Sequence, residues 1–268
     1  MISNSDIKVR NNVNVIGQGE QTIVLAHGFG CDQQMWRFLT PMLDKNYKVV
    51  LFDYVGCGKS DLSSYDKTKY STLKGYAYDV IEVCEALNLK NVILIGHSVS
   101  SIIGMHAAIL SPSLFSHLVM VCPSPCFLNF PPEYIGGFEK EDLVELINLM
   151  DKNYIGWANY LAPLVMGENN DSEYINELNR SFCSTDPKYA KPFAEATFFS
   201  DDRKALSQLT VPSLILQSSN DKLASQEIGR YMQSQISNSK LNIIYADGHC
   251  LHMTKPEAVY KALIRFID

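Results

Sequence analysis

Six short, almost wholly apolar runs alternate with longer segments of helical periodicity, and this alternation constrains the fold more than any other feature. Strands that are apolar on both faces are typical of parallel sheets covered by helices on both sides. Residues 70–89 place apolar side chains on one helical face, whereas residues 7–16 alternate weakly and are expected to form antiparallel edge strands. The sequence predicts an α/β fold with a mostly parallel sheet flanked by helices. The six runs are TIVLA (22–26), KVVLFD (48–53), NVILIG (91–96), HLVMVC (117–122), PSLILQ (212–217) and LNIIYA (241–246).

The stretch 128–200 interrupts this rhythm. It contains no convincing strand, many aromatic residues and several Pro and Gly breaks, which favours a set of short helices. We therefore expect residues 1–127 and 201–268 to form the core, and residues 128–200 to form a helical cap inserted after the sixth core strand. Five basic and twelve acidic residues give this segment an acidic surface.

Composition excludes several classes of function. The chain has 268 residues and a net charge of −6, with no Lys/Arg run, so nucleic acid is not an expected partner. The N-terminus is polar, with no secretory signal, and no apolar run is long enough to cross a membrane. Seven cysteines without paired spacing fit reduced thiols. We expect a cytoplasmic protein that does not bind membranes.

The segment NVILIGHSVSSIIGM (91–105) carries the strongest chemical signal. A buried strand runs into Gly96-His97-Ser98-Val99-Ser100 and then into an apolar helix. This strand–turn–helix context is that of a nucleophile elbow, in which a strained turn lifts a serine above the sheet. The usual pattern is G-x-S-x-G, and Ser100 occupies its last position here. Because serine is small, we expect slight crowding and no loss of function.

A serine nucleophile needs a base and an orienting acid, which follow it in the order acid then histidine in this fold class. Asp221 follows the run 212–217, and His249 follows the run 241–246. Both lie at the carboxyl edge of the sheet, so we predict the triad Ser98, Asp221 and His249. Asp247, two residues before His249, is interpreted as a turn residue. His252 remains a less favoured alternative base.

The turn His27-Gly28-Phe29-Gly30 follows another strand and frees backbone amides to face the elbow. We predict that the N–H groups of Phe29 and Val99 form the oxyanion hole. We expect no cofactor and no metal. A metal site from His249, Cys250 and His252 is conceivable, but their spacing matches no standard zinc pattern.

Aromatic residues of the cap are predicted to form an apolar substrate pocket over Ser98 together with Phe29. The candidates are Phe130, Phe138, Trp157, Tyr160 and Phe193.

Several motifs along the whole chain resemble the RsbQ family of bacterial regulators. This subfamily also includes the plant strigolactone and karrikin receptors. The resemblance implies an α/β-hydrolase fold with a four-helix cap, and the family's triad maps onto Ser98, Asp221 and His249. Two departures are Ser100 and Leu251, the latter where related chains tend to have proline. The motifs are HGFGCDQ (27–33), FDYVGCGKSDL (52–62), GHSV (96–99), SHLVMVCPSPC (116–126), PPEYIGGF (131–138), NYIGWA (153–158), FCSTDP (182–187) and GHCLHM (248–253).

The resemblance further implies a role in signalling. Members of the family act with a PAS-domain serine phosphatase to activate the general stress sigma factor (sigma-B), and they supply or process a small hydrophobic molecule. Two alternatives stay open: a metabolic carboxylesterase or carbon–carbon bond hydrolase, and a non-catalytic receptor or scaffold. The residues alone do not separate the signalling hydrolase from the metabolic hydrolase.

Overall fold

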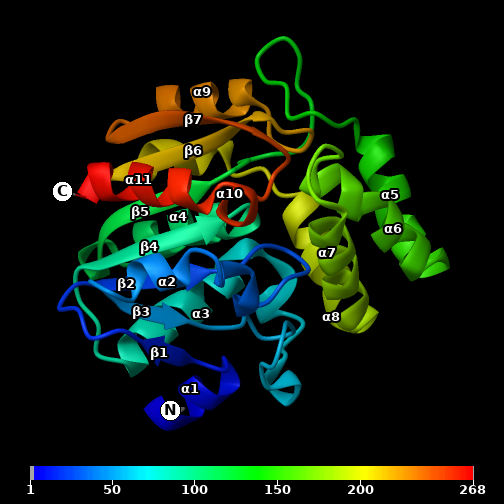
Figure 1. Cartoon of the computed structure of the whole chain (residues 1–268). Coiled ribbons are helices and arrows are strands. Elements are labelled where there is room, and N and C mark those ends of the chain that lie inside the picture. The colour runs from blue at the N-terminus through cyan, green and yellow to red at the C-terminus, as the bar shows by residue number, and fades with distance from the viewer. Residues whose placement is uncertain (1–2, 268) are drawn as a thin grey trace.

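The computed structural model describes residues 3–267 and contains a twisted seven-stranded sheet (Figure 1). The strand order is β1-β3-β2-β4-β5-β6-β7, and every neighbouring pair is parallel except β1 and β3. The mostly parallel sheet predicted from the apolar runs is therefore confirmed. The strands are β1 (Asn14–Ile16), β2 (Thr22–Ala26), β3 (Lys48–Leu51), β4 (Val92–His97), β5 (Phe115–Val121), β6 (Ser213–Asn220) and β7 (Ser239–Asp247).

Helices cover both faces of the sheet, and alternate strand residues enter two separate cores. One core contains side chains of α2, α10 and α11, and the other contains side chains of α3, α4 and α9. Burial on both faces explains why β2 and β4 lack polar alternation. The helices of this part are α1 (Asn4–Arg10), α2 (Thr40–Leu43), α3 (Leu73–Ala86), α4 (Val99–Leu110), α9 (Gln226–Gln235), α10 (Leu251–Thr254) and α11 (Pro256–Ile267).

The N-terminal segment differs from its prediction. Residues 4–10 form helix α1, because the Ser3 hydroxyl and the Asp6 carboxylate complete a capping box at its start. Arg10 at its end is buried and pairs with Glu82 at 2.6 Å. Only β1 forms an edge strand, antiparallel to β3. The expectation of edge strands over 7–16 was wrong for this helical part, and the cap consequently follows the fifth strand rather than the sixth.

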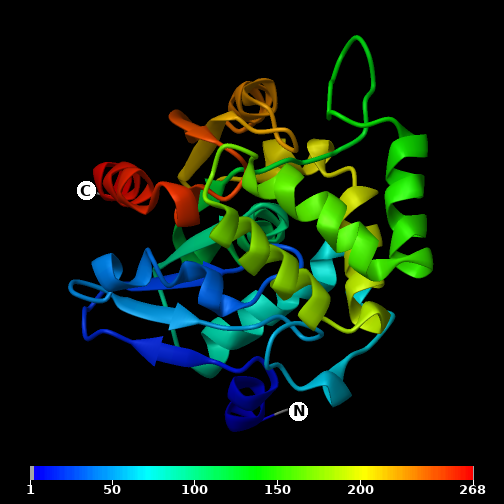
Figure 2. The same ribbon diagram turned by 45° about the vertical axis from the view of Figure 1, so that its right-hand side comes forward.

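Four α-helices lie between β5 and β6 and stand together beside one end of the sheet in both views (Figure 2). They are α5 (Lys140–Lys152), α6 (Tyr154–Met166), α7 (Ser172–Ser184) and α8 (Pro187–Phe198). The two chain segments that enter and leave this group are paired, because the Asp202 N–H donates to the Pro125 carbonyl at 2.8 Å. We call residues 128–200 the cap. No helix within residues 3–267 is long and apolar enough to cross a membrane.

Candidate active site

Ser98 lies in the sharp turn between β4 and α4. Its backbone has φ 56° and ψ −123°, a conformation that residues other than glycine rarely adopt. The Ser98 N–H donates to the Val121 carbonyl at 2.8 Å, which fixes the turn to the neighbouring strand. Strain at one residue, held in place by its surroundings, is the expected geometry of a nucleophile elbow.

The structure brings Ser98, His249 and Asp221 into one hydrogen-bonded series. His249 Nε2 lies 2.7 Å from Ser98 Oγ, and His249 Nδ1 lies 2.6 Å from Asp221 Oδ2. The second carboxylate oxygen, Asp221 Oδ1, accepts N–H groups of Leu223 and Ala224 at 2.8 and 3.0 Å. These bonds orient the carboxylate, which in turn orients the imidazole. Both His249 and Asp221 are buried, so water does not compete strongly for these bonds.

Asp247 and His252, the alternatives to Asp221 and His249, have other surroundings. The Asp247 carboxylate accepts the backbone and side-chain N–H groups of Asn169 at 3.1 and 3.0 Å, so it connects the histidine loop to the cap. His252 is fully buried against Trp36 and His97, with ring centroids 4.6 and 4.4 Å apart. Burial and the nearby His249 lower the pKa of His252 to about 3. Neither side chain is placed to exchange a proton with Ser98.

The two predicted oxyanion donors belong to neighbouring elements. Val99 is the first residue of α4, where backbone N–H groups have no intrahelical partner. Phe29 follows β2 in the loop 27–30. Ser100 joins the two elements, because its hydroxyl donates a hydrogen bond to the His27 carbonyl. The assignment of the Phe29 and Val99 N–H groups stays a prediction.

His97 supports the site from behind the elbow. Its Nε2 lies 3.0 Å from the backbone carbonyl of His249 and donates to it. Burial, with His252 and His249 nearby, holds the pKa of His97 well below its ordinary value, so the ring is neutral. The ring also packs on the loop 27–30, where a Cβ at Gly28 would lie 2.5 Å from His97 Nδ1. Glycine is therefore required at position 28 by this close approach.

The cap contacts both catalytic loops. The His249 N–H donates to the Val165 carbonyl at the end of α6, at 2.8 Å. Gly248, with φ +83°, permits this approach, since a Cβ there would lie 1.9 Å from the Met166 carbonyl oxygen. On the other side, the Ser181 hydroxyl of α7 donates to the Gly30 carbonyl at 2.8 Å.

A small apolar cavity lies beside Ser98 beneath the cap. Its volume is about 30 Å³, close to the space of one water molecule and far below the usual volume of ligand pockets. Ser98, His97 and His249 supply most of its polar atoms. The remaining residues that line it are Phe29, Cys31, Phe127, Leu161, Val165, Leu178, Phe182, Thr197, Phe198, Leu223 and Cys250.

Most of the predicted pocket residues lie elsewhere. Tyr160 is 61% exposed, because the buried residues of α6 fall on the opposite side of that helix. Phe130 is also exposed and packs under the Arg203 guanidinium, 4.1 Å from its ring centroid. Phe138 contacts Phe127 from outside the cavity, at 6.3 Å between ring centroids. For these three residues the pocket prediction was wrong.

Trp157 and Phe193 are buried but do not line the cavity. Their rings pack edge-to-face on Phe29, with centroids 6.0 and 5.6 Å away. They therefore hold Phe29, which lines the cavity, in place. The prediction that Trp157 and Phe193 contact the substrate directly is corrected to this supporting role. The residues missed from sequence include the aliphatic Leu161 and Val165, which a search for aromatic density passes over, and also the aromatic Phe182 and Phe198.

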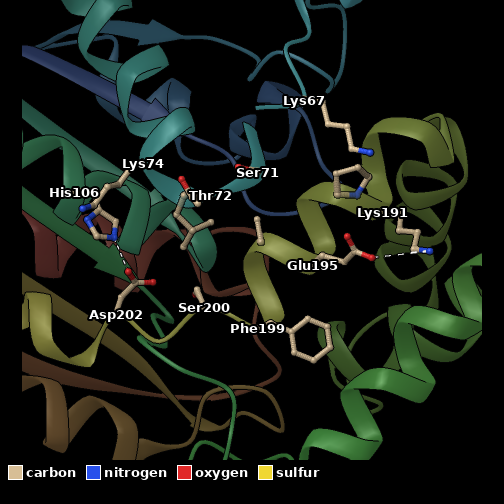
Figure 3. Close-up of a pocket in the computed structure, with 13 residues that line it drawn as sticks. Lys67, Ser71, Thr72, Lys74, His106, Lys191, Glu195, Phe199, Ser200 and Asp202 are labelled. Carbon is tan, nitrogen blue, oxygen red and sulfur yellow. Dashed lines mark hydrogen bonds and ion pairs between the residues drawn. The ribbon is translucent and has the colours of Figure 1, made fainter. Parts of the chain in front are cut away.

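A larger hollow lies away from the triad. It is an open groove of about 950 Å³ between α8 and the start of α3 (Figure 3). His106 pairs there with Asp202 at 2.6 Å, and Lys191 lies on the opposite side near Glu195. Because this groove is open and holds no nucleophile with its base, the small cavity beside Ser98 is the candidate active site.

Comparison with known proteins agrees with this fold. Residues 21–256 match the family model of the alpha/beta hydrolase fold. The chain is 40% identical over 262 residues to the Karrikin insensitive 2 receptor CA of Petunia hybrida, covering 97% of both chains. It is 33% identical over 246 residues to a strigolactone esterase of Pisum sativum, covering 91% of this chain and 92% of the relative.

A solved structure of a hydrolase from Oleispira antarctica is 58% identical, with a TM-score of 0.98, covering 99% of this chain and 97% of that one. An esterase from Exiguobacterium antarcticum shares the fold at 23% identity, with a TM-score of 0.87, covering 95% and 94%. The matched family spans most of the chain, and its relatives cover nearly their whole length. This protein therefore belongs to the α/β-hydrolase family and is an esterase-like hydrolase.

Proposed function

We propose that this protein cleaves small apolar esters with Ser98 as nucleophile, His249 as general base and Asp221 as the orienting acid. The observation that carries the proposal is the series of two short hydrogen bonds, 2.7 and 2.6 Å long, that links the three side chains. Nucleophile, base and orienting group within hydrogen-bond reach are the signature of nucleophilic acyl transfer.

The reaction follows from these contacts. Ser98 Oγ attacks the ester carbonyl carbon while His249 Nε2 accepts the hydroxyl proton. The N–H groups of Phe29 and Val99 stabilise the negative charge on the carbonyl oxygen. His249 then gives its proton to the leaving alcohol, which leaves an acyl group on Ser98. A water molecule, deprotonated by His249, then attacks the acyl carbon. The bond from that carbon to Ser98 Oγ breaks, His249 returns the proton to Ser98, and the acid is released.

The cavity supports a small, apolar acyl group. Most of the residues that line it are aromatic or aliphatic, and Ser98, His97 and His249 are among its few polar ones. The cavity is far smaller than the usual ligand pocket, so we propose that the cap shifts when substrate enters. Sites of this kind bury apolar substrate and fix its orientation with few polar groups.

Labelling and turnover test the proposal together. A serine-directed sulfonyl fluoride is expected to modify Ser98, as located by peptide mass spectrometry, and to abolish hydrolysis of p-nitrophenyl acetate. Ser98→Ala should lose both labelling and turnover. Ser116→Ala, at the start of β5, is the matched control and should retain both. Hydrolysis by folded Ser98→Ala at the wild-type rate would refute the proposal.

We further propose a regulatory role, in which this hydrolase processes a small hydrophobic molecule and activates a PAS-domain serine phosphatase of the sigma-B stress response. Its support is the motif resemblance to the RsbQ family. A second support is that relatives 40% identical over nearly the whole chain are named receptors. A cell reporting sigma-B activity should respond to the wild-type protein and not to Ser98→Ala.

The acidic cap supplies the matching test of the partner. Glu141 and Glu145 are exposed on α5, whereas Asp142 accepts the Glu139 N–H at 3.2 Å and caps the helix. The double variant Glu141→Lys with Glu145→Lys therefore changes the surface charge and keeps the Asp142 hydrogen bond at the N-terminus of α5. Charge complementarity mainly sets association rate, so phosphatase activation should weaken while ester hydrolysis continues. Full activation by this variant would argue against docking through α5.

A further inference from the structure

We infer that Cys122, Asp221 and His249 form an inhibitory site for a thiophilic divalent cation such as Zn²⁺. The Cys122 sulfur, an Asp221 carboxylate oxygen and a ring nitrogen of His249 all lie within 4.8 Å of one another. Zn²⁺ binds sulfur, nitrogen and oxygen at distances of about 2.0–2.3 Å, so small movements bring the three atoms around one ion. The inhibitory consequence rests on the proposed function, but the binding itself does not.

Cys122 reaches this position through the sheet. It directly follows β5, which lies between β4, the strand before Ser98, and β6, the strand before Asp221. Its backbone has φ 51°, and its N–H donates to the Leu216 carbonyl of β6 at 2.7 Å. The three side chains thus come from three separate strand ends that meet at one edge of the sheet.

Backbone N–H groups donate to two of the proposed ligands. Burial and the nearby Asp221 raise the pKa of the Cys122 thiol well above its ordinary value, while the backbone amides of Ser218 and Leu251 act in the opposite direction. A proline at position 251 would lack this amide hydrogen. Asp221 Oδ1 already accepts two backbone N–H groups, from Leu223 and Ala224. Such outer bonds orient ligands and strengthen metal binding.

The donor set suits a thiophilic cation. When an ion displaces the Cys122 proton, its two positive charges balance the thiolate and the Asp221 carboxylate in this buried space. Within residues 3–267 this is the one group of three histidine, cysteine or acidic side chains close enough to hold a metal ion. Cys250 and Cys31 line the substrate cavity and are not part of this group.

Ion binding changes the protons of the triad. The Cys122 thiol loses its proton to solvent, and the His249 proton moves from Nδ1 to Nε2 so that the Nδ1 lone pair binds the ion. Nε2 then carries a hydrogen and cannot accept the proton of Ser98. The ion also takes over the carboxylate that orients the imidazole. The result is a folded protein whose nucleophile has no base.

Cobalt binding tests the site without relying on hydrolysis. The full-length Ser98→Ala protein is titrated with Co²⁺, and the sulfur-to-cobalt charge-transfer absorption is recorded. We expect this band in Ser98→Ala and in the wild type. Cys122→Ala should lose it and bind Co²⁺ more than about 100-fold more weakly, because loss of a ligand exceeds the effect of losing an outer bond. Cys250→Ala, also buried and next to His249, and Cys183→Ala, the exposed cysteine, should keep the band.

Inhibition forms the second arm. Zn²⁺ should slowly abolish p-nitrophenyl acetate hydrolysis by the wild type, and a chelator should restore it. Cys122→Ser, measured against its own metal-free rate, should be far less sensitive. A wild-type protein without the absorption band overturns the inference, as does a band that persists in Cys122→Ala or disappears in Cys250→Ala. If the band appears in a wild type that hydrolyses no ester, the proposed function fails and the metal site stands.

Discussion

The hydroxyl of Ser100 donates a hydrogen bond to the backbone carbonyl of His27, two residues before Phe29. It also lies 3.1 Å from the Tyr54 hydroxyl. Position 100 is glycine in the usual elbow pattern, and crowding was the expected effect of a serine there. In the structure Ser100 instead connects the helix after the nucleophile to the loop that carries the second proposed oxyanion donor.

Removing this hydroxyl should weaken both stability and turnover. Ser100→Ala leaves the buried His27 carbonyl without its donor, which costs about 1–3 kcal/mol of unfolding free energy. Urea unfolding measures this loss, and p-nitrophenyl acetate hydrolysis should show a lower kcat. Tyr54→Phe, which keeps the Ser100–His27 bond, should lose less. Equal stability and kcat in Ser100→Ala and wild type would contradict this role.

The two aspartates near His249 should respond differently to loss of charge. Asp221→Asn should reduce kcat by up to about 10⁴-fold, because His249 loses the acceptor that fixes its tautomer. Asp247→Asn should affect kcat far less, since Asp247 bonds Asn169 and Asn220 rather than the imidazole. Steady-state kinetics of the two isosteric variants decide the assignment, and a larger effect at Asp247 would reverse it.

Buried neutral His252 should make the protein sensitive to mild acid. Its pKa is about 3 in the folded chain, against about 6.5 for an unfolded histidine. As pH falls below 6.5, the unfolded chain binds a proton that the folded chain does not, so stability falls. The loss from this residue is about 2 kcal/mol between pH 7 and pH 5. His252→Phe should shrink the pH dependence of urea unfolding by that amount, and an unchanged dependence would refute the explanation.

Enlarging the cavity should change acyl preference. Leu161 lines the cavity from α6, and its neighbour Tyr160 points outward. Leu161→Ala should raise kcat/KM for p-nitrophenyl hexanoate relative to acetate by about tenfold or more, because a few methylene contacts are worth 1–3 kcal/mol each. Tyr160→Ala is the matched control and should leave the ratio unchanged. An unaltered ratio in Leu161→Ala would place the acyl group elsewhere.

The sequence was sufficient for the sheet and for the residues at its carboxyl edge. Ser98, Asp221 and His249 each follow an apolar run, and parallel strands bring such positions together without any knowledge of packing. Helix α1 was missed although Ser3 and Asp6 formed a recognisable capping box. A short amphipathic segment at a chain end fits a strand or a helix equally well by pattern alone.

The cavity and the metal-binding group depend on information that a linear pattern lacks. Packing among the cap helices decides which side of α6 faces Ser98. Counting aromatic residues therefore could not show that Leu161 faces the cavity and that Tyr160 is exposed. Cys122 is 99 residues from Asp221 in the chain numbering, and no short spacing motif connects them. Only the register of β5 beside β6 brings the two side chains together.

Because the His249 N–H donates to the Val165 carbonyl, the proposed catalytic base is held in part by the cap. A cap that moves away from the sheet would release this restraint on the imidazole, and loss of the Ser181–Gly30 bond would likewise release the loop 27–30. Substrate binding energy therefore has to restore catalytic alignment as well as hold the ligand. A molecule too small to bring the cap back would reach Ser98 and still react slowly. Selectivity would then depend on how well a bound ligand holds the cap closed over Ser98. A site that holds only water would keep the cap closed least well.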